Sequence, residues 1–85
     1  MRLPVIKHIV QFSKEKDEDF ILETIETLED LSVNESLKDH EIDTIGELLS
    51  NFYGAIEVCK EIENGSNESD ALNNFMKRVI GSIDN

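Results

Sequence analysis

The chain has 85 residues, 39% of them hydrophobic, and its 19 acidic and 8 basic side chains give a net charge of −11. This charge disfavours binding to nucleic-acid phosphates and to anionic membranes, because both ligands need positive potential on the protein. No apolar run approaches the roughly 18 residues that cross a bilayer, and a single cysteine excludes a disulfide within the chain. We therefore expect one cytoplasmic domain spanning residues 1–85, small enough to gain stability from a second subunit.

The charge is unevenly distributed along the chain. Residues 1–16 contain four basic side chains and one carboxylate, a net charge of +3, and the remaining residues contain four basic and eighteen acidic side chains, a net charge of −14. Two interpretations are open. The basic segment docks against the acidic body of its own chain, or the acidic surface binds a basic partner.

Helical spacing of apolar residues begins near the N-terminus. Pro4 suits a first helical turn, and a short helix of about ten residues is predicted from Val5, Ile6, Ile9, Val10 and Phe12. A second helix is predicted to begin at residues 17–19, whose carboxylates favour a helix N-terminus. The pattern assigns its apolar face to Phe20, Ile21, Thr24, Ile25, Leu28 and Leu31, and it leaves Leu22 as an exposed contact.

The strongest pattern in the chain predicts a long third helix from about 37 to 63. Its apolar residues repeat at alternating spacings of three and four, a heptad-like seam formed by Ile42, Ile45, Leu49, Phe52, Ile56 and Cys59. Asn34 or Ser36 is the predicted N-cap. Gly65 is expected to end the helix, because glycine readily takes the left-handed conformation.

A fourth helix is predicted from about 68 to 83, capped by Ser66 or Asn67 and covering the third helix. Its apolar face is assigned to Leu72, Phe75, Met76, Val79, Ile80 and Ile83. The sequence thus predicts an all-α fold, a compact bundle of four helices organised around the helix at about 37–63.

A row of small residues runs along the long helix. Gly46, Ser50 and Gly54 recur every four residues, and Tyr53 lies beside them. Because glycine inside a helix costs roughly 1 kcal/mol relative to alanine, two glycines here indicate a close packing contact. The partner is either another segment of the same chain or the same helix of a second subunit in a two-fold dimer. These four residues are the candidate helix-contact or dimer-interface residues.

Two other features bear on chemistry. His40, Asp43 and Glu47 share one helical face, a spacing that can bind a divalent metal, but this face lies opposite the apolar seam and is interpreted as solvated. Cys59 occupies the seam and is interpreted as a core residue. The sequence contains no CxxC pair and no glycine-framed serine nucleophile. We predict no catalytic, metal or cofactor site.

Three segments, LPVIKH at residues 3–8, LKDHEIDTIGEL at 37–48 and NFYGAIEV at 51–58, resemble a family of small, acidic, uncharacterised bacterial helical proteins. The resemblance covers nearly the whole chain. It implies no established activity, and it transfers no catalytic or binding residue to these positions.

Together, these features favour a non-catalytic protein–protein interaction or accessory module that acts as a homodimer and has a protein partner. The alternative is a small metal-binding or redox-accessory protein that uses Cys59 or His40.

Overall fold

The computed structural model describes residues 1–84, which form four α-helices and, within that range, no strand. The helices are α1 (Leu3–Glu15), α2 (Glu18–Leu31), α3 (Asp39–Glu63) and α4 (Glu68–Asp84). The predicted all-α fold is confirmed. The predicted start of α2 and the predicted bounds of α3 and α4 agree with the structure to within two residues, which is the usual uncertainty of a helix boundary.

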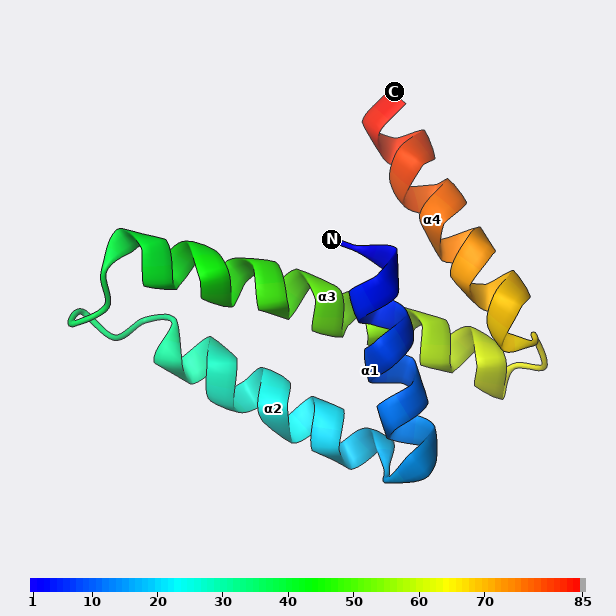
Figure 1. Ribbon diagram of the computed structural model, residues 1–85, viewed down its shortest axis with the longest axis horizontal. Coiled ribbons are helices and arrows are strands. Elements are labelled where there is room, and N and C mark those ends of the chain that lie inside the picture. Colours follow the sequence, from blue (N-terminus) through cyan, green and yellow to red (C-terminus); the bar gives the residue numbers. More distant parts are fainter. Residues whose placement is uncertain (85) are drawn as a thin grey trace.

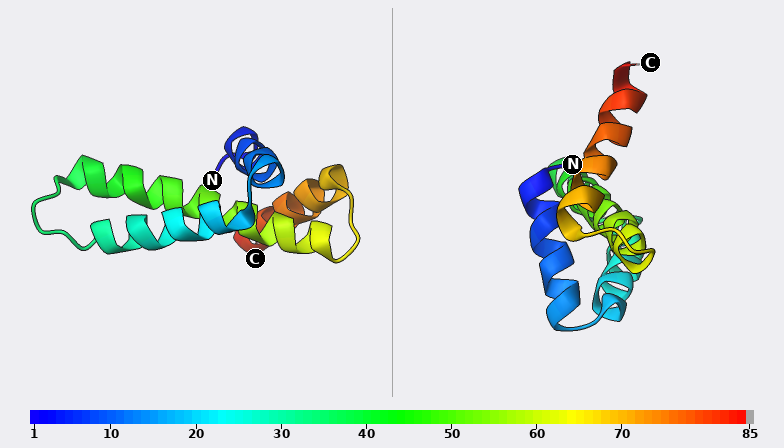
Figure 2. Two further views of the ribbon diagram at one scale, coloured as in Figure 1. Left: turned by 90° about the horizontal axis from the view of Figure 1, so that it is seen from below. Right: turned by 90° about the vertical axis from the view of Figure 1, so that its right-hand side faces the viewer.

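The α2–α3 hairpin forms the long axis of the molecule, and its two helices lie side by side and antiparallel (Figures 1 and 2). α1 crosses the C-terminal half of α3, and α4 turns back from the end of α3 and runs away at an angle (Figure 1). The Cα atoms span 43 × 36 × 17 Å, so the molecule is thin in one direction. The end of the hairpin near residues 32–38 has neither α1 nor α4 over it.

Polar side chains and one glycine explain three of the helix ends. Asp17 Oδ1 accepts a hydrogen bond from Asp19 N at 3.1 Å, so the predicted carboxylate start of α2 is confirmed. Gly65 has a φ angle of 110° after the end of α3, the left-handed conformation expected there. Asn67 Oδ1 accepts from Asp70 N at 2.8 Å and caps α4.

The predicted N-cap of α3 is wrong. The helix begins after Lys38, and Glu41 Oε1 accepts a hydrogen bond from Lys38 N at 2.9 Å. Asn34 Oδ1 instead accepts from Ser36 N at 2.8 Å and closes a turn within the loop. Because Glu41 reaches back to the start of the helix, α3 satisfies that amide without a serine or asparagine at the cap.

The hydrophobic core lies where α1, α2 and α4 meet the C-terminal half of α3. Ile6, Val10 and Val58 are the largest fully buried side chains. Among the residues whose burial is described, Asn51 is the buried polar one: its Oδ1 accepts from Arg2 N at 2.8 Å, and its Nδ2 donates to Glu47 O at 2.9 Å. These two bonds satisfy the amide and fasten the start of α1 to the middle of α3.

Some predicted core positions are on the surface. Ile45, Ile56 and Cys59 of the seam are buried, but Ile42 is 40% exposed because α3 extends past the part of the hairpin that α1 covers. The predicted apolar faces of α1 and α2 also contain exposed residues, namely Phe12, Phe20, Thr24 and Leu31. Val58 and Ala55, outside the seam, are buried because α1 and α4 cover a second side of α3. The side chains of Ile80 and Ile83, predicted for the face of α4, lie outside those described.

Candidate interaction surfaces and the Cys59 cleft

The candidate row of small residues is divided between the interior and the surface. A Cβ atom at Gly54 would lie 3.0 Å from Ile6 Cδ1 and 3.0 Å from Phe75 Cζ, so this glycine admits α1 and α4 close to α3. At Gly46 no neighbouring atom comes within 4 Å of the same position. The two glycines therefore have different surroundings in one helix, and only Gly54 packs against other helices of its chain.

Gly46 and the half-buried Ser50 form, together with the exposed Ile42 and Tyr53, a surface that we call the α3 shoulder. These residues follow one another at intervals of four, four and three, which places them on one side of the helix. Ser50 Oγ donates to Glu47 O at 2.8 Å within α3. Ile42 and Tyr53 are 40% and 43% exposed, so apolar surface lies at both ends of the α3 shoulder.

Tyr53 links the α3 shoulder to α2. Its hydroxyl donates a hydrogen bond to Glu29 Oε2. This bond is the largest cause of a Tyr53 pKa above the ordinary value, and burial and the charge of Glu29 act in the same direction. Leu22 lies seven residues before Glu29 on the same side of α2 and is exposed, as predicted.

A second exposed surface lies along α2, and we call it the Phe20 strip. Phe20 is 52% exposed and contacts Phe12 edge to face, with ring centroids 6.0 Å apart. A shallow hollow of about 330 Å³ adjoins Phe20 and is lined also by Glu23, Thr24, Thr27 and Leu28. The Phe20 strip consists of Phe12, Phe20, Thr24, Thr27, Leu28 and Leu31, which helical spacing places together along α2 from its contact with α1 to its C-terminal end.

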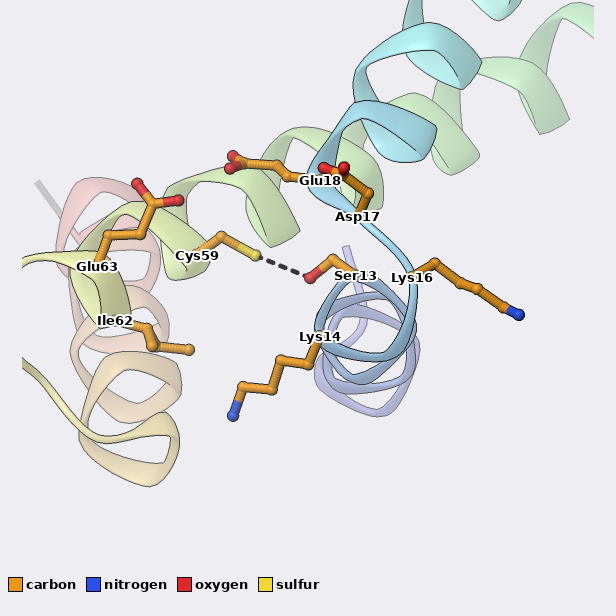
Figure 3. A pocket seen from close by; sticks show the side chains of 8 residues that line it. All are labelled: Ser13, Lys14, Lys16, Asp17, Glu18, Cys59, Ile62 and Glu63. Carbon is orange, nitrogen blue, oxygen red and sulfur yellow. Dashed lines mark hydrogen bonds between the residues drawn. The ribbon is translucent and has the colours of Figure 1, made fainter.

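A cleft between α1, α2 and α3 contains the only cysteine of the sequence. Figure 3 shows Cys59 Sγ facing Ser13 Oγ at 3.3 Å, and Ser13 Oγ also donates to Val10 O at 2.7 Å. The cleft measures about 370 Å³ and combines both charge signs with one aliphatic side chain. Its lining residues are Ser13, Lys14, Lys16, Asp17, Glu18, Cys59, Ile62 and Glu63.

The electrostatics of this cleft disfavour a reactive thiolate. Burial raises the pKa of the Cys59 thiol, and the charges of Glu18 and Glu63 act in the same direction against the opposing effects of Ser13 and Lys14. The pKa of the Glu18 carboxyl is also raised. Burial is the largest cause, and the next are a hydrogen bond to Glu63 and the negative charge of Glu63. Cys59 is buried, as its position in the seam predicts, and the raised pKa of its thiol disfavours the thiolate.

The structure places the histidine and carboxylates of the solvated α3 face at the surface. His40, Asp43 and Glu47 are exposed, and the described residues contain no group of three or more His, Cys, Asp or Glu side chains arranged to bind a metal ion. None of the described helices combines the length and the apolar character that a bilayer span requires.

A family model covers residues 1–84 of the chain. The chain belongs to DUF6952, a family of unknown function. No curated protein and no solved structure is significantly similar to this DUF6952 chain. The expectation of an uncharacterised family is therefore confirmed, and any role has to be inferred from the surfaces of the molecule.

Sequence reasoning missed the Phe20 strip of this DUF6952 protein, because it assigned Phe20, Thr24 and Leu31 to a buried face. The apolar arc of α2 is wider than the stripe that α3 covers, and the buried residues of α2 are Ile21 and Ile25. Thr24 within the predicted core face was the available signal, since a solvated face tolerates threonine better than a core does.

Proposed function

We propose that this DUF6952 protein is a non-catalytic protein–protein interaction module and that it acts as a homodimer formed through the α3 shoulder. The observation that carries the proposal is the area of its surface. The chain exposes 5883 Å², whereas a compact monomer of 9.7 kDa exposes about 5,100 Å² by the usual scaling with mass. The excess of roughly 750 Å² approximates the area that one partner buries in a standard interface, about 800 Å².

The α3 shoulder supports a helix–helix contact for two reasons. Residues 48–56 carry no charged side chain, although the chain as a whole has a net charge of −11. Ser50 and Tyr53 of the α3 shoulder lie in this stretch, so a second α3 that crosses near Ser50 meets less like-charge repulsion than one that crosses beside Asp43 and Glu47. Gly46 leaves room beside the helix, so two backbones can approach closely at the crossing.

The homodimer is tested by the mass of the purified protein in light scattering across a wide range of concentrations. We expect a mass of twice 9.7 kDa at high concentration. Gly46→Leu should give the monomer mass at the same concentrations, because the added side chain occupies the space that the second helix needs. The variant should remain folded, since no atom apart from the adjoining backbone of α3 lies within 4 Å of the new Cβ atom and leucine is a better helix former.

Glu47→Leu is the matched control, because it adds the same side chain to the same helix on a different side. This variant should keep the mass of the parent protein. A parent protein that is monomeric at every concentration contradicts the homodimer, and a Gly46→Leu variant that remains dimeric contradicts the placement on the α3 shoulder.

The alternative role, a metal-binding or redox-accessory protein that uses Cys59 or His40, has less support. A redox-active cysteine reacts as the thiolate, and burial disfavours the Cys59 thiolate because it raises the pKa of the thiol. His40 lies on an exposed face of α3. We therefore prefer the interaction role.

A further inference from the structure

We propose that the Phe20 strip is a docking site for a basic amphipathic helix supplied by another protein. This inference rests on the proposed role as an interaction module, and it names the chemistry of the partner. It concerns α2 and its contact with α1, so the surface is distinct from the α3 shoulder.

The shape and composition of the Phe20 strip fit a helix of about three turns. From Phe20 to Leu31 the strip extends roughly 16 Å along α2, given a rise of about 1.5 Å per residue. Thr24 Oγ1 donates to Phe20 O at 2.7 Å and Thr27 Oγ1 donates to Glu23 O at 3.0 Å. Since both hydroxyl protons are used within α2, the threonine methyl groups contribute apolar surface between Phe20 and Leu31.

The charges around the Phe20 strip select a basic partner. α2 contains six carboxylates and no lysine, arginine or histidine. The ion pairs of the described residues join α1 to α4 and α4 to α3, and none of them involves a carboxylate of α2. Glu23 lines the hollow, and Asp30 lies seven residues further along the same side. Lysine or arginine side chains beside the apolar stripe of a partner helix would lie near these carboxylates.

The same charges disfavour a second copy of the chain as the occupant. Two α2 helices packed through their Phe20 strips would bring Glu23 and Asp30 of both copies together, and α2 contains no cation to offset these carboxylates. On the α3 shoulder, by contrast, Ser50 and Tyr53 lie within residues 48–56, which carry no charged side chain. A basic helix of another protein therefore fits the Phe20 strip better than a homodimer contact does.

The test uses the full chain and a designed peptide of about four helical turns, with leucine at every third or fourth position and lysine elsewhere. Binding is followed by fluorescence anisotropy of the labelled peptide. Nuclear magnetic resonance locates the site through shifts of backbone amides. A peptide of the same composition in scrambled order controls for non-specific attraction to a chain of charge −11. We expect the amphipathic peptide to bind at least about tenfold more tightly than the scrambled one and to shift amides of residues 20–31.

Variants on the two sides of α2 separate docking from general attraction. Thr24→Lys places a cation in the hollow and should weaken binding about tenfold or more through like-charge repulsion. Glu23→Gln should weaken binding about twofold to fivefold, as expected for an exposed charge pair. Glu26→Gln removes the same charge from the same helix outside the hollow, and it should change binding by less than Glu23→Gln.

Three results would overturn the docking site: equal affinity for the scrambled peptide, unchanged affinity of the Thr24→Lys variant, or amide shifts located away from α2. Self-association that Thr24→Lys abolishes would instead assign the Phe20 strip to a second copy. Failure of peptide binding by a chain that is a dimer in light scattering would remove this inference alone, and the homodimer would stand. A monomeric chain that binds the peptide would remove the homodimer alone.

Discussion

Tyr53 is the single tyrosine of the chain, and its environment can therefore be measured without interference from another phenol. Its hydroxyl reaches across the hairpin to Glu29, a contact between α3 and α2 that the sequence could not indicate. Sequence spacing placed Tyr53 beside the row of small residues. Its partner depends on how far α2 is shifted along α3, and no pattern within either helix fixes that register.

The first prediction is that Tyr53 titrates above the ordinary tyrosine pKa in the folded chain. Ultraviolet absorbance of the phenolate measures this directly. Because the carboxylate of Glu29 accepts the phenol hydrogen bond, Glu29→Gln should lower the pKa of Tyr53 toward the value in the unfolded chain. The folded chain holds this proton more tightly than the unfolded chain, so stability should fall as the pH rises past the ordinary tyrosine pKa.

Glu26→Gln serves as the control for this titration, because it removes one charge from α2 without removing the partner of Tyr53. An unchanged Tyr53 titration in Glu29→Gln would show that the hydrogen bond is not the cause of the shift.

Within α3, two glycines of the same row have opposite surroundings, and this contrast gives the second prediction. Gly46→Ala should raise the free energy of unfolding by up to about 1 kcal/mol, because alanine is the better helix former and its methyl group meets no atom. Gly54→Ala should lower the free energy of unfolding by about 1 kcal/mol or more. Its methyl group must displace Ile6 and Phe75, which are both buried and come from different helices.

Urea unfolding of both variants, at a concentration where the chain is monomeric, measures the difference between the two positions. Equal effects of the two substitutions would contradict the packing of α1 and α4 against Gly54. A loss of stability in monomeric Gly46→Ala would show that the surroundings of Gly46 are not open.

The glycine pair also shows how far the sequence specifies the elements. Helical periodicity located α2, α3 and α4 closely, with cap residues marking the starts of α2 and α4 and Gly65 marking the end of α3, because these signals depend on neighbours along the chain. The same spacing could not tell Gly46 from Gly54, since the difference arises from α1 and α4, which lie far from α3 in the sequence. For the same reason, the exposed Phe20 and Leu31 were assigned to the core. A hydrophobic side chain is more stable when buried, but the sequence does not show whether another helix packs against it.

At the scale of the whole molecule, the net charge of −11 gives the third prediction. Self-repulsion among the carboxylates destabilises the folded state, and added salt screens it. The melting temperature should therefore rise by on the order of 5 °C between low and physiological ionic strength, which corresponds to about 1 kcal/mol for a domain of this size.

Circular dichroism during heating measures this shift, and sodium and potassium chloride should act equally if screening is the cause. A melting temperature that falls with salt would mean that favourable ion pairs, such as Lys14–Glu68 at 2.9 Å, outweigh the repulsion.

The hydrogen bond between Arg2 N and Asn51 Oδ1 joins residues 49 positions apart, and this separation affects how the chain folds while it is being synthesised. α1 leaves the ribosome before the half of α3 against which it packs. At about 5–20 residues per second, the apolar side of α1 waits roughly 2–10 s for that partner. During this interval α2 is the available neighbour, and the contact of Phe12 with Phe20 is already within reach. The nascent chain can therefore shield its first helix with its second before the long helix completes the core.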